Sequence, residues 1–130
     1  MIYLAIPYTH NLSSMEQARF SIANLVASHL MKEGIHVYSP ISHSHPIRME
    51  GGLPGTWEYW EKHCRKILSI CDKVFVVCIP GWEDSHGVQE ELKIAKELGL
   101  PIIYFYHPLS IEDVLPRFSE IDELVERLKA

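Results

Sequence analysis

The chain has 130 residues, of which 47% are hydrophobic and 22% charged, and its formal net charge at pH 7 is −5. This length suits a single domain, residues 1–130, with a proper hydrophobic core. The acidic balance argues against a nucleic-acid groove, since no basic cluster appears beyond Lys62, Arg65 and Lys66. The longest apolar runs are strand-sized, too short to cross a bilayer, so we expect no membrane association.

The cysteines and the first residues bear on the cellular compartment. Cys64, Cys71 and Cys78 form no CxxC pair and leave an odd count, which is typical of buried thiols in a reducing environment. The N-terminal run Met-Ile-Tyr-Leu-Ala-Ile-Pro has no basic segment and is typical of a first strand rather than a signal peptide. We therefore expect a cytoplasmic protein.

Strand and helix patterns alternate along the chain. The predicted elements are strands at 2–6, 35–39, 73–79 and 101–106, and helices at 13–33, 56–70, 85–99 and from 119 to the end. Ser13, Ser14 and Glu16 form an apparent capping box for the first helix. Residues 40–55 contain three prolines and three glycines and are predicted to form a long loop, with the length of a functional lid.

This alternation predicts an α/β fold: a doubly wound parallel sheet with helices on both faces. Right-handed crossovers make a flavodoxin-like sheet of four to five strands, in the order 2-1-3-4, the simplest topology. In such sheets ligands bind beyond the carboxyl ends of the strands, at the switch point between strands 1 and 3. The residues expected near this edge are Tyr8, Thr9, His10, His43, His45, Trp82, Ser85 and Glu91.

Glu91 occupies a position where the helix at 85–99 otherwise places apolar residues. At about 100° per residue it falls among Val88, Ala95 and Leu98. A carboxylate directed at a core is costly unless its charge is compensated, and one near a helix start suits a nucleophile or a general base. The alternative is a glutamate at the rim of the apolar face, bonded to a backbone amide or an arginine.

Ser85 precedes the same helix and is a candidate N-cap. Its hydroxyl and the free amides of His86, Gly87 and Val88 could hold an anion such as a phosphate, and Gly87 leaves that approach uncrowded. Plain helix capping by Ser85 is the alternative interpretation.

Histidine and tryptophan residues supply further candidates. His43 and His45 could bind a metal, but they lack a third ligand at fixed spacing, so we expect a role in pocket polarity or loop stabilisation and no metal. Trp57 and Trp60 could stack on a planar base, form a subunit contact or pack in the core. Trp82, in a predicted loop, is a better candidate for lining a pocket.

Several familiar motifs are missing from the sequence. It contains no Walker A loop, GxGxxG, Gly-x-Ser-x-Gly elbow or zincin motif. Kinase, dinucleotide-dehydrogenase and serine-hydrolase functions therefore lose their usual support, and we expect no cofactor.

The chain resembles the nucleoside 2-deoxyribosyltransferase superfamily, especially its small members and the deoxynucleoside 5′-monophosphate N-hydrolases. The likeness covers most of the chain, from Ile2-Tyr-Leu-Ala-Ile-Pro-Tyr8 through Ser39-Pro-Ile-Ser-His-Ser-His-Pro46 to Pro101-Ile102. Its most specific part is Ser85-His-Gly-Val-Gln-Glu-Glu91-Leu-Lys-Ile-Ala95, which is similar to the superfamily pattern [S/D]-x-G-x-x-x-E-x-x-x-A.

The resemblance implies roles for individual residues. Glu91 would attack C1′ of the sugar, and a serine at position 85 would favour a 5′-monophosphate over a free nucleoside. Tyr8 would line the sugar pocket, and Arg19 would correspond to a phosphate-side residue. One departure concerns Cys64, which stands where the family has an aspartate. A thiol does not replace a carboxylate in orienting a hydroxyl or moving a proton, so His63 or another group substitutes, or activity is altered or lost.

The leading hypothesis is therefore cleavage of the N-glycosidic bond of a (deoxy)ribonucleoside 5′-monophosphate, by a hydrolase or a base-exchanging transferase. Ser85 would hold the phosphate, while Tyr8, Trp82 and the 40–55 segment would enclose sugar and base. A catalytically silent nucleotide-binding module is the alternative, favoured by Cys64. A metal-dependent hydrolase built on His43 and His45 is a third hypothesis. The resemblance also implies a homodimer or larger homo-oligomer.

Overall fold

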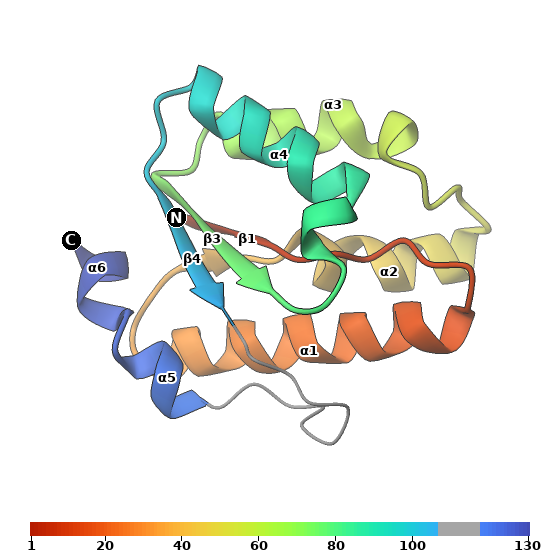
Figure 1. Cartoon of the computed structure of the whole chain (residues 1–130). Coiled ribbons are helices and arrows are strands. Elements are labelled where there is room, and N and C mark those ends of the chain that lie inside the picture. The colour runs from red at the N-terminus through yellow and green to blue at the C-terminus, as the bar shows by residue number, and fades with distance from the viewer. Residues whose placement is uncertain (107–117) are drawn as a thin grey trace.

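The computed structural model describes residues 1–106 and 118–130 (Figure 1). Among these residues, four strands form one parallel sheet in the order β2-β1-β3-β4. The strands are β1 Ile2–Ala5, β2 Val37–Tyr38, β3 Lys73–Cys78 and β4 Ile102–Tyr106. This order confirms the predicted flavodoxin-like, doubly wound α/β fold.

Helices cover both faces of the sheet. They are α1 Ser13–Lys32, α2 Pro40–Gly51, α3 Trp57–Leu68, α4 His86–Glu97, α5 Phe118–Asp122 and α6 Val125–Lys129, with a short 3-10 helix η1 at Trp82–Asp84. In Figure 1, α3 and α4 lie on one face of the sheet, and α1 lies on the other with α5 beside it. Burial on both faces explains why β3 is apolar from Val74 to Cys78 instead of alternating with polar residues.

The core is divided into two layers by the sheet. Alternate strand residues such as Leu4 and Phe75 pack with α1, α5 and α6. Their neighbours, such as Tyr3 and Val76, pack with α3 and α4. Because side chains alternate between the faces of a strand, Tyr3 lies on the same face as Glu91.

The predicted loop at 40–55 is wrong, since most of this segment forms α2. Ser39 caps the helix by accepting a hydrogen bond from the Ser42 amide, and Pro40 occupies the first turn, where a missing amide proton costs little. Gly52 ends the helix with φ 65°, a left-handed conformation that glycine adopts without strain. Pro40 and Gly52 therefore mark the ends of the helix, while Pro46 lies inside it, and the segment is not an open loop.

Two other details of the helices differ from expectation. The apparent capping box is not formed: α1 follows Leu12 without a side-chain cap, and Glu16 instead accepts from the His10 amide at 3.2 Å. The predicted terminal helix is broken into α5 and α6, although Ile121, Val125 and Leu128 are buried in the core. None of the helices in the described ranges has the length and apolarity that a bilayer crossing needs.

Candidate functional site

A cavity of 370 Å³ lies beyond the carboxyl ends of β1, β2 and β3. It is bounded by the segment after β1, by α2 and α3, and by the start of α4. Its lining residues are Tyr8, Thr9, Pro40, Ile41, Ser44, Arg48, Gly55, Thr56, Trp57, Glu58, Trp60, His63, Cys64, Asp84, Ser85, His86, Gly87 and Glu91. The volume falls in the range of small-molecule sites. This is the edge of the sheet at which the topology predicts a ligand site.

Glu91 reaches this cavity from the second turn of α4. Its side chain is directed inward, with only 7% of the residue exposed, and Oε2 accepts a hydrogen bond from the Tyr3 hydroxyl. Val88 and Ala95 are buried beside it, whereas Leu98, the C-cap of α4, is exposed. The carboxyl group is thus held between a buried strand and an open cavity, and it is not a solvated rim glutamate.

Burial sets the protonation of Glu91. Removal from water raises the pKa of this carboxyl to about 8, and the hydrogen bond from Tyr3 opposes the shift. The group is therefore mostly protonated at neutral pH and gains its negative charge as the pH rises through 8. A carboxylate that ionises in this range is a stronger base and nucleophile than an ordinary glutamate.

Cys64 lies against Tyr3 and Glu91 and also lines the cavity. Burial, followed by the charge of Glu91, raises the pKa of its thiol to about 12. The pKa of Tyr3 is also raised, by burial and then by the same charge. Of these three groups, Glu91 is the one that changes protonation near neutral pH.

The start of α4 forms one end of the cavity. Ser85 Oγ accepts from the Val88 amide at 3.3 Å, which is the plain capping interaction. Ser85 and Gly87 nevertheless line the cavity, and helix-start amides attract anions. Asp84 and Glu58 line the same end, and Glu58 Oε1 lies 3.5 Å from His86 Nε2. This end therefore combines amide donors with carboxylates.

A hydrogen-bonded network holds Tyr8 at the opposite end. The Tyr8 hydroxyl contacts His45 Nδ1 and accepts from Arg48 Nη1 at 2.9 Å. Arg48 Nη1 also donates to Glu16 Oε1 at 3.2 Å. The pKa of His45 is lowered by burial and then by the Arg48 charge, which keeps its ring neutral. Arg48 therefore places a positive charge at the cavity and fixes the Tyr8 ring.

Residues 1–107 match the model of a protein family described as Domain of unknown function (DUF1937). The chain belongs to this family. No curated protein matches the chain. All residues that line the cavity fall inside the matched part of the DUF1937 domain, whereas α5 and α6 lie outside it.

Four of the predicted binding residues of this DUF1937 domain lie outside the cavity lining. His45 Nδ1 contacts the Tyr8 hydroxyl. The rings of His43 and His63 are stacked, with their centroids 5.3 Å apart. The Arg19 guanidinium donates to the carbonyls of Tyr8, Thr9 and Pro80, so it joins the segments that follow β1 and β3.

Trp82 is the fourth of these residues. Its ring packs against those of Tyr104 and Tyr106 in the edge strand β4, with centroid distances of 5.9 and 6.0 Å. The structure thus gives Trp82 a role in covering the sheet edge. Within the described ranges, neither His43 nor His45 belongs to a group of three potential metal ligands.

The aromatic residues of α3 contribute a flat wall to the cavity. Trp57 and Trp60 are half-buried, and Trp60 Nε1 donates to the Pro54 carbonyl at 2.8 Å. His63 packs edge-on against Trp60 and bonds the Tyr38 hydroxyl at 3.2 Å. This wall offers stacking surface for a planar group.

Sequence reasoning missed two residues that shape the site. Tyr3 lies in an apolar run that predicts a strand, and nothing in the sequence near it predicts the hydrogen bond from its hydroxyl to Glu91. Arg48 lies in a segment whose composition predicts a loop, and the one sequence feature that connects it with the site is its position one helical turn after His45.

Proposed function

We propose that this protein cleaves the N-glycosidic bond of a (deoxy)ribonucleoside 5′-monophosphate, with Glu91 as the nucleophile. The observation that carries the proposal is the buried Glu91 carboxyl, which lines a cavity at the carboxyl edge of the sheet and has a pKa of about 8. The resemblance of residues 85–95 to the nucleoside 2-deoxyribosyltransferase pattern supports the same assignment.

The reaction would proceed in two displacements. Ionised Glu91 attacks C1′ of the sugar, the C1′–N bond breaks, and the base leaves with the bonding electrons and takes up a proton from solvent water. Water or a second base then attacks C1′ and releases the carboxylate. The Tyr3 hydroxyl occupies Oε2, so Oε1 is the oxygen that is free to form the ester.

The cavity offers a partner for each part of such a substrate. The amides at the start of α4, with Ser85, suit the phosphate. Trp57 and Trp60 suit the planar base, and Tyr8 suits the sugar. The carboxylates of Glu58 and Asp84 lie at the phosphate end and would favour binding of the phosphate together with a cation or a proton.

A silent nucleotide-binding module is the second candidate, and Cys64 favours it. A thiol with a pKa of about 12 donates a weak hydrogen bond but does not accept a proton in the physiological range. If turnover needs a second carboxylate at this position, the protein binds nucleotides without cleaving them.

The deciding experiment is an assay of nucleosides and nucleoside 5′-monophosphates for free base by chromatography. The proposal expects base release from at least one monophosphate, and loss of that release in Glu91→Gln with the fold intact. Mass spectrometry of acid-quenched mixtures should detect a glycosyl adduct on Glu91. Full activity in Glu91→Gln would contradict the mechanism. Calorimetric binding of monophosphates without base release would favour the silent module.

A further inference from the structure

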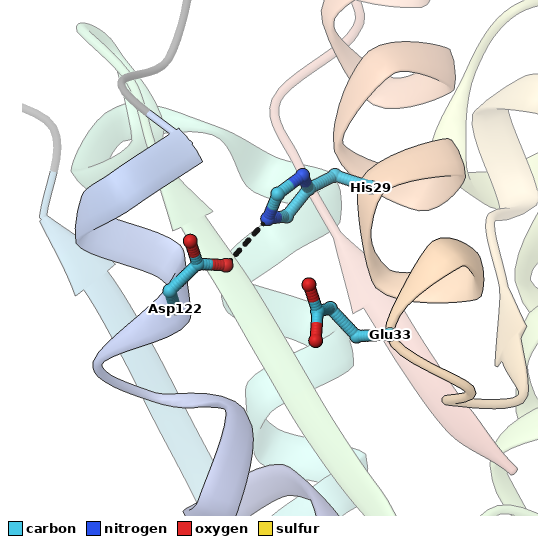
Figure 2. Close-up of side chains that lie close together, drawn as sticks. All are labelled: His29, Glu33 and Asp122. Carbon is cyan, nitrogen blue, oxygen red and sulfur yellow. Dashed lines mark hydrogen bonds and ion pairs between the residues drawn. The ribbon is translucent and has the colours of Figure 1, made fainter.

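Three side chains able to ligate a metal converge at the end of α1, on the face of the sheet opposite α3 and α4 (Figure 2). His29 lies in the last turn of α1 and Glu33 follows it as the C-cap, while Asp122 comes from α5. His29 Nε2 lies 2.7 Å from Asp122 Oδ1. One potential ligand atom from each residue lies within 4.8 Å of the other two.

The spacing of these residues suits a common site. His29 and Glu33 are four positions apart, which places them on the same face of a helix. In a tetrahedral site, bonds of about 2.0–2.2 Å place the ligand atoms roughly 3.3–3.6 Å apart. His29 Nε2 and Asp122 Oδ1, now 2.7 Å apart, would therefore separate by roughly 0.7 Å, and a pair at the 4.8 Å limit would approach by roughly 1.3 Å, through side-chain rotation. Asp122 has 51% of its side chain exposed, so it has room for such a movement.

The charge and the donor atoms of these three side chains favour a zinc ion. A neutral imidazole and two carboxylates together carry a charge of −2, which balances a divalent ion. Imidazole nitrogen suits zinc and its first-row neighbours, whereas magnesium and calcium prefer sites built from oxygen alone. Three protein ligands leave a fourth position for water.

We propose that His29, Glu33 and Asp122 bind one Zn²⁺ ion that ties α5 to the end of α1. The helix α5 has five residues, and a helix of this length is not stable without tertiary contacts. Apolar contacts from Ile121 already place it on the core, and the ion adds a polar clamp one residue further along the chain. Because the ligands lie at the opposite end of α1 from the cavity, the ion is structural and takes no part in the proposed reaction.

The test uses the full chain after removal of metal with a chelator. Titration with ZnCl₂ in a calorimeter should give one equivalent of bound Zn²⁺, and the same addition should raise the melting temperature. The variants His29→Ala and Asp122→Asn should weaken binding at least about tenfold, the lower end of the loss seen when only outer-shell partners of a metal are removed. Replacement of Zn²⁺ by Co²⁺ should give the visible absorption of a nitrogen- and oxygen-ligated ion.

Matched controls come from neighbouring residues. His36→Ala removes another exposed histidine, and Glu123→Gln removes the carboxylate next to Asp122; both should bind Zn²⁺ as tightly as the unaltered chain. The proposal is overturned if no Zn²⁺ binds, if His29→Ala binds it unchanged, or if MgCl₂ raises the melting temperature as much as ZnCl₂. These readouts do not depend on nucleotide cleavage, so the two proposals stand or fall separately.

Discussion

The Tyr3 hydroxyl donates a hydrogen bond to Oε2 of Glu91 and so joins the first strand of the sheet to the second turn of α4. Both residues are buried, and the free side of the Glu91 carboxyl faces the cavity. Because both residues are buried in the folded protein, the protonation state of Glu91 affects the free energy of unfolding as well as the reactivity of the carboxyl group.

Glu91 should make the protein less stable as the pH rises. Its pKa is about 8 when folded against an ordinary value of 4.5, so the folded state binds a proton that the unfolded state loses between these two values. Each pKa unit corresponds to about 1.4 kcal/mol, so Glu91→Gln should raise the free energy of unfolding at pH 7 by about 3 kcal/mol. Chemical denaturation at several pH values measures this gain.

The pH dependence separates this effect from improved packing. The gain in Glu91→Gln should shrink to nearly zero by pH 4, where the unfolded glutamate is protonated as well. Glu97→Gln, on the exposed side of the same helix, should show no comparable gain at any pH. A gain that is constant from pH 4 to pH 8 would contradict the raised pKa of Glu91.

Replacing Tyr3 with Phe should shift the pH–rate profile. The Tyr3 hydroxyl lowers the pKa of Glu91, so Tyr3→Phe should raise that pKa and move the rising limb of kcat/KM to higher pH. The loss of one buried hydrogen bond should also cost about 1 kcal/mol of stability. Initial rates of base release between pH 5 and pH 10 measure the shift. The exposed Tyr59→Phe is the control, and an unmoved limb in Tyr3→Phe would show that Glu91 does not set the profile.

Substitutions of Ser85 should separate helix capping from phosphate binding. Ser85→Asp retains a strong N-cap, so stability should change little, but its negative charge should repel a monophosphate. Ser85→Ala loses the cap, at a cost of about 1 kcal/mol, without adding charge. We expect KM for a monophosphate to rise more than tenfold in Ser85→Asp and less in Ser85→Ala, as measured by steady-state kinetics. Equal KM values in the two variants would place the phosphate elsewhere in the cavity.

Gly55 should be required for the position of Arg48. A Cβ atom at Gly55 would lie 2.7 Å from both Cζ and Nε of Arg48, so Gly55→Ala should push the guanidinium away from Tyr8 and Glu16. Glu16 is buried, and the weakened pairing should cost about 1–3 kcal/mol. Thermal unfolding measures the loss, and ligand affinity should fall with it.

The matched control for Gly55 is Gly51→Ala. A Cβ atom there meets only the Leu53 side chain, at 3.5 Å, which is ordinary contact. Because Gly51 lies in α2, alanine should leave stability unchanged or raise it slightly. If the two variants melt at the same temperature, the close approach of Arg48 to Gly55 has no energetic role.

The fold followed from the sequence because its signals are local. Apolar runs such as residues 73–79 mark the strands, and their alternation with amphipathic helices predicts a parallel sheet with its ligand edge at the carboxyl ends. The inward direction of Glu91 also follows from helical periodicity alone. These features need no knowledge of distant contacts.

The remainder depended on tertiary structure. The composition of residues 40–55 predicts a loop because it does not show where the prolines and glycines stand. Pro40 and Gly52 occupy positions that helix ends accept. Once α2 is missed, Arg48 is missed with it. Trp82 does not line the cavity because its ring packs on the edge strand β4. The sequence around residue 82 does not show that β4 lies at the edge of the sheet.

The high pKa of the Cys64 thiol determines how this side chain reacts with electrophiles and oxidants. At neutral pH the sulfur stays protonated, and it is the thiolate that reacts with alkylating agents and peroxides. Iodoacetamide and hydrogen peroxide should therefore leave the folded protein unmodified at Cys64. Covalent probes for this site should be electrophiles that esterify carboxylates, used on the alkaline side of neutrality.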